Sequence, residues 1–352
     1  MEISLQNKQT LIPILLLLIT FTTFPKAIAD RGMVPVEPDV SVYEPGQKAI
    51  VAWNGSEEIL ILSTDITADA DTLALEIMPL PSNPTVIEMA SFDSFVRIQE
   101  YIWMRGPEVM GETYRADQTK SVDVTFHERI GAHDITVVNA SDASEFTVWM
   151  ENYLENNGVT QQVSLQSFEA VIEDYMARGF RFFVLDLIDV SSVENSVEPI
   201  LYKFETSFLY YPLEISAPIP GGTIITLFLL TNSEVEDNLY SSYQPLKLGH
   251  YISLTKWEAI KFSLTNGELS IIDLRLGELF EDKAWLTVLK YDGKTSGLTK
   301  DLMIAKSDIA PDTDSTENTS QLLIFGALIG ATCALGGVAF TFLITRKKYR
   351  KY

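Results

Sequence analysis

The chain has 352 residues, of which 46% are hydrophobic and 11% aromatic, and its formal net charge is −22. This length suffices for one large or two ordinary domains, and the apolar content excludes disorder along the whole sequence. Basic residues gather at the two ends, so the segment 30–345 keeps 19 basic against 47 acidic residues, a net charge of −28. Such a surface repels nucleic acid and anionic lipid headgroups, so we expect no nucleic-acid partner.

Residues 1–29 have the pattern of a signal peptide. A polar start precedes the apolar run Leu11–Phe24, and Ala27 and Ala29 match the A-x-A pattern of a cleavage site. The run has 14 residues, fewer than the roughly 20 that a membrane-spanning helix needs. An uncleaved anchor is the alternative, which the following proline and lysine disfavour. We therefore predict export and a mature chain that begins at residue 30.

A second apolar segment lies near the carboxyl terminus. Leu322–Ile344 is an uncharged run of 23 residues, about 34 Å long as a helix, which exceeds the roughly 30 Å of a hydrocarbon core. The basic tail 346–352 follows it, and basic residues favour the cytoplasmic side. We predict a single transmembrane helix over 322–345, a domain over 30–306 outside the cell membrane, and a cytoplasmic carboxyl terminus.

Small residues interrupt the predicted membrane helix. Gly326 and Gly330 form a G-x-x-x-G, a spacing that permits close pairing of membrane helices, so a homo-oligomer through this helix is a hypothesis. Cys333, the only cysteine, lies in the same segment. The outer domain is therefore expected to fold without an internal disulfide.

The segment 307–321, rich in Ser, Thr and Asp, is predicted to be an extended stalk. It contains one of three N-glycosylation sequons, which begin at Asn54, Asn139 and Asn318. At Asn54 the alternative is turn formation, which the glycine that follows it favours.

The outer domain begins with predicted strands. Lys48–Trp53 and Glu57–Thr64 are rich in Ile, Val and Leu, and Asn54-Gly55 between them is a common hairpin signal. Leu73–Leu80 is predicted as a third strand, which prolines end. Three amphipathic helices are then predicted from apolar residues three or four apart, at about 91–106, 141–157 and 165–179. Their aromatic stripes indicate core packing, with a ligand groove as the alternative.

Further strands are predicted around and after these helices, at 122–128, 134–138, 180–190, 199–207, 209–215 and 223–231. The remainder is expected to contain short strands, a hairpin at Asp292-Gly293 and a helix near Trp257. The Pro- and Gly-rich run 218–222 is either a boundary within the domain or a loop. Because strands cluster with helices between two groups, the predicted fold class is α+β, with mixed or antiparallel sheets.

The middle of the chain also resembles a known family. The residues that carry the resemblance are, in order, Gly131–Val138, Ala140–Ala143, Trp149, Asn157-Gly158, Tyr175, Gly179-Phe180, Phe182–Val184, Pro199-Ile200 and Tyr211–Leu213. This order resembles an uncharacterised family of exported bacterial and archaeal proteins, a domain of unknown function, over roughly Val34 to Ser216. The resemblance implies a surface location and a shared fold, and it implies no reaction. The chain departs from the family in lacking cysteines near the mature start and in having His133 where an aromatic Tyr is usual.

No catalytic or metal motif of high specificity is present. The three histidines, His127, His133 and His250, are scattered and form no zinc-ligand spacing. Acidic loops are the remaining candidates, and Asp65, Asp69 and Asp71 share one loop that could bind calcium weakly at the surface. The loop does not match an EF-hand, so an ordinary solvated loop is the favoured alternative and no cofactor is expected.

The topology, the acidic domain and the lack of catalytic motifs favour a non-enzymatic surface module that binds a partner protein, an envelope component or a cation at the cell exterior. The alternative is an extracellular hydrolase or other enzyme with an unrecognised carboxylate-based site. In that case dispersed carboxylates such as Asp186 and Asp189 would have to meet in the fold.

Overall fold

The computed structural model describes residues 33–36, 42–105, 129–159, 165–192, 195–219, 221–236, 246–253 and 256–309. These residues belong to one compact unit that ends at Ile309. The run 218–222 connects two elements inside this unit. The leader 1–29, the strand predicted at 122–128, most of the stalk, and the span and tail over 322–352 lie outside the described residues.

The larger of two main sheets has nine strands, in the order β13-β17-β12-β2-β3-β10-β5, with β16 on β17 and β9 on β3. At its centre β2 (Val42–Trp53) and β3 (Glu57–Ala68) form a hairpin, and Gly55 in its turn has φ +99°. β12 (Gly222–Thr231) is parallel to β2 and antiparallel to β17 (Lys283–Lys294), so the sheet is mixed. The other strands are β5 (Val86–Met89), β9 (Asn195–Ser196), β10 (Ile200–Glu205), β13 (Lys247–Leu248) and β16 (Lys261–Thr265).

The smaller main sheet is antiparallel and has the strand order β1-β4-β8-β7-β6. Its strands are β1 (Val34–Pro35), β4 (Thr72–Leu80), β6 (Arg129–Ile130), β7 (His133–Asn139) and β8 (Phe182–Val190). Two further strand pairs complete the unit, β11 (Phe208–Tyr211) with β18 (Leu302–Ala305) and β14 (His250–Ser253) with β15 (Lys256–Glu258). Three short 3-10 helices are η1 (Glu214–Ser216), η2 (Thr295–Gly297) and η3 (Lys306–Asp308).

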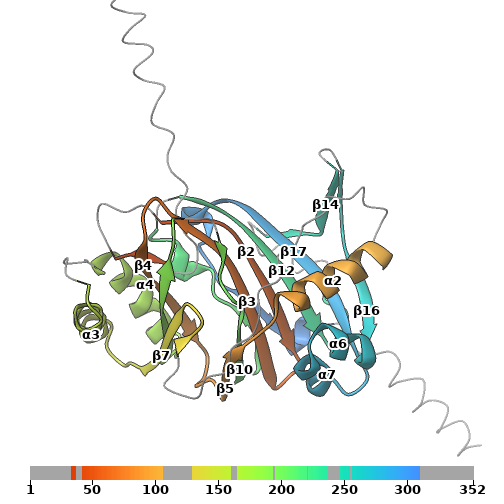
Figure 1. Cartoon of the computed structure of the whole chain (residues 1–352). Helices are drawn as coiled ribbons and strands as arrows, with labels where there is room; N and C mark the ends of the chain where they lie inside the picture. The colour runs from red at the N-terminus through yellow and green to blue at the C-terminus, as the bar shows by residue number, and fades with distance from the viewer. Residues whose placement is uncertain are drawn as a thin grey trace, which may run out of the picture. The chain divides into compact units, whose positions relative to one another are not determined.

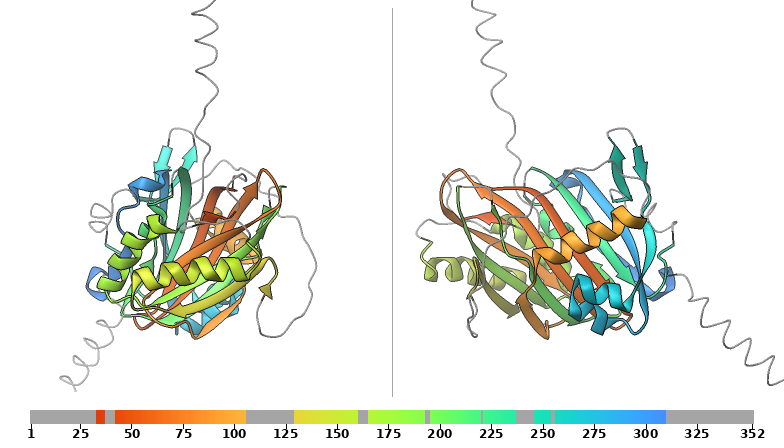
Figure 2. Two further views of the ribbon diagram at one scale, coloured as in Figure 1. Left: turned by 90° about the vertical axis from the view of Figure 1, so that its left-hand side faces the viewer. Right: turned by 45° about the vertical axis from the view of Figure 1, so that its right-hand side comes forward.

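Helices cover the two sheets separately (Figures 1 and 2). α3 (Ala143–Asn156) and α4 (Gln166–Ala177) pack on the smaller sheet, whereas α2 (Phe92–Arg105), α6 (Asn266–Ile272) and α7 (Leu274–Leu279) pack on the larger one. No helix in the described part of the chain is long and apolar enough to cross a membrane. The span predicted over 322–345 lies elsewhere in the chain and stays a prediction.

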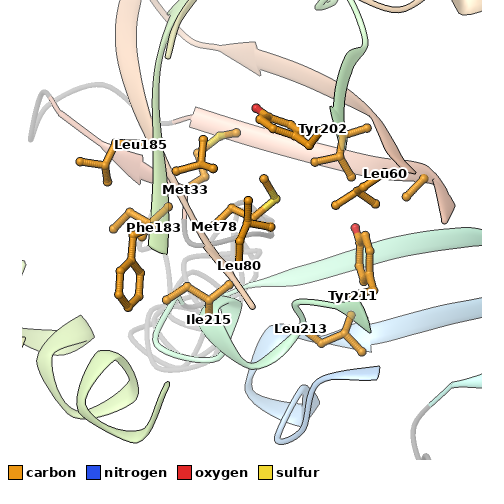
Figure 3. Close-up of a cluster of buried hydrophobic side chains, with 14 of the residues drawn as sticks. Met33, Leu60, Met78, Leu80, Phe183, Leu185, Tyr202, Tyr211, Leu213 and Ile215 are labelled. Carbon is orange, nitrogen blue, oxygen red and sulfur yellow. The ribbon is translucent and has the colours of Figure 1, made fainter. Parts of the chain in front are cut away.

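Alternating side chains of β3 divide the interior into two cores. Leu60 and Leu62 belong to the core that the two sheets and the helices α3 and α4 share, where Met78 and Leu80 of β4 also lie (Figure 3). Ile59 and Ile61 point to the opposite face of the larger sheet and pack against α2, α6 and α7. Because side chains alternate along a strand, this central strand is buried on both faces.

The structure confirms an α+β fold, the hairpin at Asn54-Gly55 and three helices close to their predicted ranges. Two local predictions are wrong. Trp257 lies in strand β15 rather than in a helix, and the two helices of this region, α6 and α7, follow it. Asp292 and Gly293 lie inside β17, opposite β12, and form no hairpin, because an Asp-Gly pair can also continue an extended strand when a neighbour pairs with it.

Candidate functional site

The predicted acidic loop is not assembled as a metal site. Asp65 lies within β3, whereas Asp69 and Asp71 lie in the exposed turn before β4, where Oδ1 of Asp71 accepts a hydrogen bond from the Ser192 amide at 3.0 Å. Across the described residues, no group of three or more His, Cys, Asp and Glu side chains is arranged to hold a metal ion. Weak calcium binding here stays a prediction to which the geometry adds nothing.

The two carboxylates on which a hydrolytic site would depend do not meet. Asp186 is 2% exposed, whereas Asp189, three residues along β8, is exposed. An odd separation along a strand places side chains on opposite faces of the sheet. Asp189 instead lines an open hollow of about 420 Å³ together with Asp71, Thr72, Leu73, Val190 and Ser191.

Asp186 belongs to a buried polar cluster between the two sheets. It lies directly opposite Glu76 of β4 in the strand register, and its Oδ2 is 2.5 Å from Nδ1 of His133 on β7. Nε2 of His133 is 3.0 Å from the carbonyl oxygen of Glu198, just before β10. A carbonyl only accepts, so Nε2 carries a proton, and Nδ1 and Asp186 share a second one.

The charge of this cluster follows from its surroundings. Burial by itself lowers the pKa of His133, but the attraction of the Asp186 carboxylate, the hydrogen bond to it and the charge of Glu76 outweigh burial. The pKa of His133 is therefore raised above its usual 6.5. The pair joins the neighbouring strands β7 and β8 of the smaller sheet, and the contact of His133 with the Glu198 carbonyl reaches toward the larger sheet. His133 is 5% exposed, so the pair is closed to a substrate.

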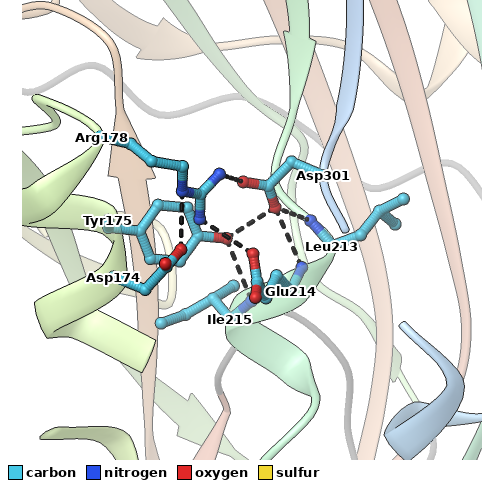
Figure 4. Close-up of polar contacts among 7 residues, drawn as sticks. All are labelled: Asp174, Tyr175, Arg178, Leu213, Glu214, Ile215 and Asp301. Atoms are coloured by element: carbon cyan, nitrogen blue, oxygen red, sulfur yellow. Dashed lines mark hydrogen bonds and ion pairs between the residues drawn. The ribbon is translucent and has the colours of Figure 1, made fainter. Parts of the chain in front are cut away.

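A second buried network joins α4 to the end of the domain (Figure 4). Oδ1 of Asp301 accepts hydrogen bonds from the Tyr175 hydroxyl at 2.6 Å and from the amides of Leu213 and Glu214 at 2.9 and 3.0 Å. The Tyr175 oxygen in turn accepts from the Ile215 amide at 3.1 Å. Asp301 thus fixes the start of η1 against α4.

Arg178, just after α4, completes this network. Its guanidinium bonds Oδ2 of Asp301 at 2.9 Å, Asp174 at 2.7 Å and Glu214 at 2.9 Å, and its centre lies 4.4 Å from the Tyr175 ring centroid. Burial and the charge of Asp301 raise the pKa of the Tyr175 hydroxyl well above 10, so this group stays a hydrogen-bond donor. Each charged group in this network forms an ion pair, which is typical of a network that stabilises the fold.

Glu58 is another buried acid, on the sheet face that carries Leu60. Its Oε2 accepts a hydrogen bond from the Tyr210 amide at 2.7 Å, whereas Oε1 is buried with no hydrogen-bond partner among the described residues. Burial raises the pKa of this carboxyl well above 4.5. Burial in the core therefore favours the uncharged form of the Glu58 carboxyl.

The predicted modification sites differ in accessibility. Asn54 Oδ1 accepts hydrogen bonds from the amides of Ser56 and Glu57 at 3.0 and 2.9 Å, and its Nδ2 donates to the Leu279 carbonyl at 3.3 Å. This arrangement is the turn chemistry expected as the alternative to glycosylation. Asn139 is exposed at the end of β7, while Asn318, Gly326 and Gly330 lie outside the described residues.

Exposed apolar side chains gather on helices of the described part of the chain. Large apolar side chains exposed to solvent concentrate on β5, α2, α6 and α7, namely Met89, Val96, Trp103, Met104, Ile271 and Leu274. A smaller group, Val148 and Trp149, lies on α3. Exposed apolar groups of this kind mark interaction surfaces. Sequence periodicity could not have found them, because it assigns aromatic stripes to the core.

The two helical layers differ in charge. α2 has two acidic and two basic residues, so its net charge is zero. α3 and α4 together contain six acidic residues, three on each helix, and neither helix has a basic residue. The layer on the smaller sheet is therefore strongly negative, whereas α2 on the larger sheet is neutral.

The fold and these surfaces define an α+β protein with closed internal charge networks and open helix faces. The chain belongs to the family described as "Uncharacterized protein conserved in bacteria" (DUF2330), whose model matches residues 25–302. This match confirms the resemblance to a family of unknown function and extends it beyond Ser216. No curated protein matches the chain.

Among solved structures, the chain is similar to that of baculovirus P35, with a TM-score of 0.45 and 12% identity over 79% of this chain and 99% of that one. It is also similar to a mutated baculovirus P35 after caspase cleavage (TM-score 0.37, 9% identity, 74% of this chain and 99% of that one). A caspase-8/P35 complex gives a TM-score of 0.36 at 9% identity over 74% of this chain and 96% of that one. At TM-scores below 0.5, these similarities define neither the function nor the partners of this chain.

Proposed function

We propose that the chain is a membrane-anchored cell-surface protein, without catalytic activity, that binds a cationic protein of the cell envelope through helix α3. The signal-peptide pattern of 1–29, the apolar run over 322–345 and the basic tail support the location. Membership of a family of unknown function leaves the molecular role open.

The outer face of α3 is the observation that carries this proposal. Val148 and Trp149 are 54% and 40% exposed, and no described element covers them. Trp149 stacks on Tyr153 with the ring centroids 5.4 Å apart and an interplanar angle of 15°. This stacking holds the indole ring in place at the surface, so the residue presents a rigid aromatic contact.

The charges around this face indicate the kind of partner that it would bind. Glu145 lies one helical turn before both Val148 and Trp149, and Glu155 is exposed near the carboxyl end of α3. The last turn has no basic residue to offset the negative end of the helix dipole. A ligand that combines Arg or Lys with apolar side chains could form ion pairs with these carboxylates and a cation–π contact with the indole.

The location can be tested by labelling intact cells with a membrane-impermeant, lysine-reactive reagent. Lys294 and Lys300 are exposed in the domain and should be labelled, whereas Lys347 in the predicted tail should not. Mass spectrometry of the recovered protein reads the result. Labelling of Lys347 alone would place the domain inside the cell and contradict the predicted topology.

Binding can be tested with the full-length protein in nanodiscs and a synthetic peptide that alternates arginine with leucine. Trp149→Ala removes the cation–π contact, worth about 1 to 2 kcal/mol, and should weaken binding roughly tenfold. Glu145→Lys should weaken it further and flatten its salt dependence, because it replaces an attraction with a repulsion. Isothermal titration calorimetry measures both changes.

Trp103→Ala is the matched control, because it removes an indole of similar exposure, 44%, from the neutral helix α2. It should bind the peptide as the wild type does. An equal loss in both tryptophan variants, or none in either, would contradict a site on α3 and indicate only nonspecific attraction to an acidic protein.

A further inference from the structure

A separate surface, the outer stripe of α2, has the pattern of a contact between identical chains. The exposed residues of this helix are Asp93, Val96, Arg97, Trp103, Met104 and Arg105, and the side chain of Glu100 is 40% exposed. Val96 and Trp103 are seven residues apart, as are Arg97 and Met104, so the two residues of each pair lie on the same side of the helix about two turns apart. We infer that two copies of the chain associate through this stripe, with their α2 helices antiparallel about a twofold axis.

The charges of the stripe fit such a contact. Arg97 and Glu100 are 47% and 40% exposed, and within one chain they pair at 2.8 Å. In a twofold contact each residue of one copy meets a reciprocal residue of the other. An axis that passes between these two positions places Arg97 of each copy against Glu100 of the second copy, so two ion pairs form together.

The apolar side chains flank these pairs. Val96 is 39% exposed on one side, and Trp103 and Met104 are 44% and 69% exposed on the other. In the antiparallel arrangement Val96 of one copy lies toward Trp103 of the second copy. A stable interface buries roughly 800 Å² on each partner, more than one helix stripe offers. Ile271 and Leu274, exposed on the neighbouring helices α6 and α7, extend the apolar area.

The charge of the whole domain favours a second copy here over contacts elsewhere. The segment 30–345 has a net charge of −28, so most of its surface repels an identical chain. α2 has a net charge of zero and adds nothing to this repulsion. The same neutrality makes α2 a poor surface for the cationic partner proposed for α3, so this inference does not rest on that proposal.

The inference can be tested with variants of the full-length chain that reverse the charge of Arg97 or Glu100. Sedimentation equilibrium in detergent micelles measures their self-association. Arg97→Glu and Glu100→Arg each set like charges against one another at both reciprocal contacts, and each should weaken self-association at least about tenfold. The double variant should dimerise as the wild type does. An equimolar mixture of the two single variants should form heterodimers, because one copy then provides two acidic and the other two basic residues.

The mixture distinguishes a contact between chains from an effect on helix stability within one chain. In the mixture neither variant regains its own Arg97–Glu100 pair, so recovery of the dimer can come only from pairing between chains. Dimers unaffected by the single variants, or single variants that fail to pair in the mixture, would overturn the inference. Gly326→Leu with Gly330→Leu tests the membrane helix separately. If the dimer is lost in that variant and Arg97→Glu has no effect, the chains associate through the membrane helix. This result would also overturn the inference of a contact through α2.

Discussion

Replacing Asp301 with alanine is expected to lower the free energy of unfolding by about 3 to 5 kcal/mol, the range for removing one partner of a buried ion pair. Its carboxylate is fully buried and bonds Arg178, the Tyr175 hydroxyl and the amides of Leu213 and Glu214. Alanine would leave all four donors without this acceptor. Urea denaturation followed by circular dichroism measures the change in the midpoint and the slope.

Asp174→Ala is the matched control, because it removes a carboxylate from the same guanidinium. Asp174 pairs with Arg178 at 2.7 Å, but its side chain is 53% exposed. An exposed pair four residues apart on a helix contributes about 0.3 to 0.5 kcal/mol, so this variant should be close to the wild type. Similar losses in both variants would show that burial does not determine the strength of this network.

The regular elements were predictable where local chemistry determines them. Asn54-Gly55 forms a turn for two local reasons. The Asn54 side chain accepts hydrogen bonds from the two backbone amides after Gly55, and Gly55 adopts a positive φ. α6 was missed although Thr265 and Glu268 form a capping box, a signal present in the sequence. Gly267 in the first turn masks that signal, because glycine lowers helix propensity.

The internal networks were not predictable, because they depend on strand pairing. His133 and Asp186 are 53 residues apart, and Arg178 and Asp301 are 123 apart. Nothing in the spacing of these residues indicates that β7 pairs with β8 or that Asp301 caps η1.

The exposed stripe of α2 could not be predicted from the sequence for a different reason. The helical period placed Val96 and Trp103 on the buried face with Phe95 and Ile102. Only Phe95 and Ile102 are buried, and no described element covers the other two.

The stability of the domain is expected to fall as the pH rises above 6.5. His133 has a raised pKa in the folded chain, so the folded state binds more protons than the unfolded state between the two pKa values. The stabilisation is complete below the unfolded pKa and is lost as the pH rises through the folded one. The loss is about 1.4 kcal/mol for each pH unit that separates them. Urea midpoints between pH 4 and pH 9 measure it.

Asp186 is the source of this dependence, because its carboxylate and its hydrogen bond oppose the effect of burial on His133. Asp186→Ala should lower the free energy of unfolding by about 1 to 3 kcal/mol at pH 6, because burial then favours neutral His133 and leaves its Nδ1 without a hydrogen-bond partner. Asp186→Asn keeps the shape of the side chain and can donate to neutral His133. The loss in the free energy of unfolding caused by Asp186→Asn should therefore be small at pH 8 and should grow as the pH falls.

A second buried group acts in the same direction and must be separated from the histidine. Glu58 also has a raised pKa, so it too binds more protons in the folded state and loses stabilisation as the pH rises. His133→Gln should remove only the part of the fall that begins near pH 6.5. Glu58→Gln should remove the part that begins near the ordinary carboxyl pKa of 4.5. If His133→Gln loses stability with pH as steeply as the wild type, the His133–Asp186 pair is not the source of the fall.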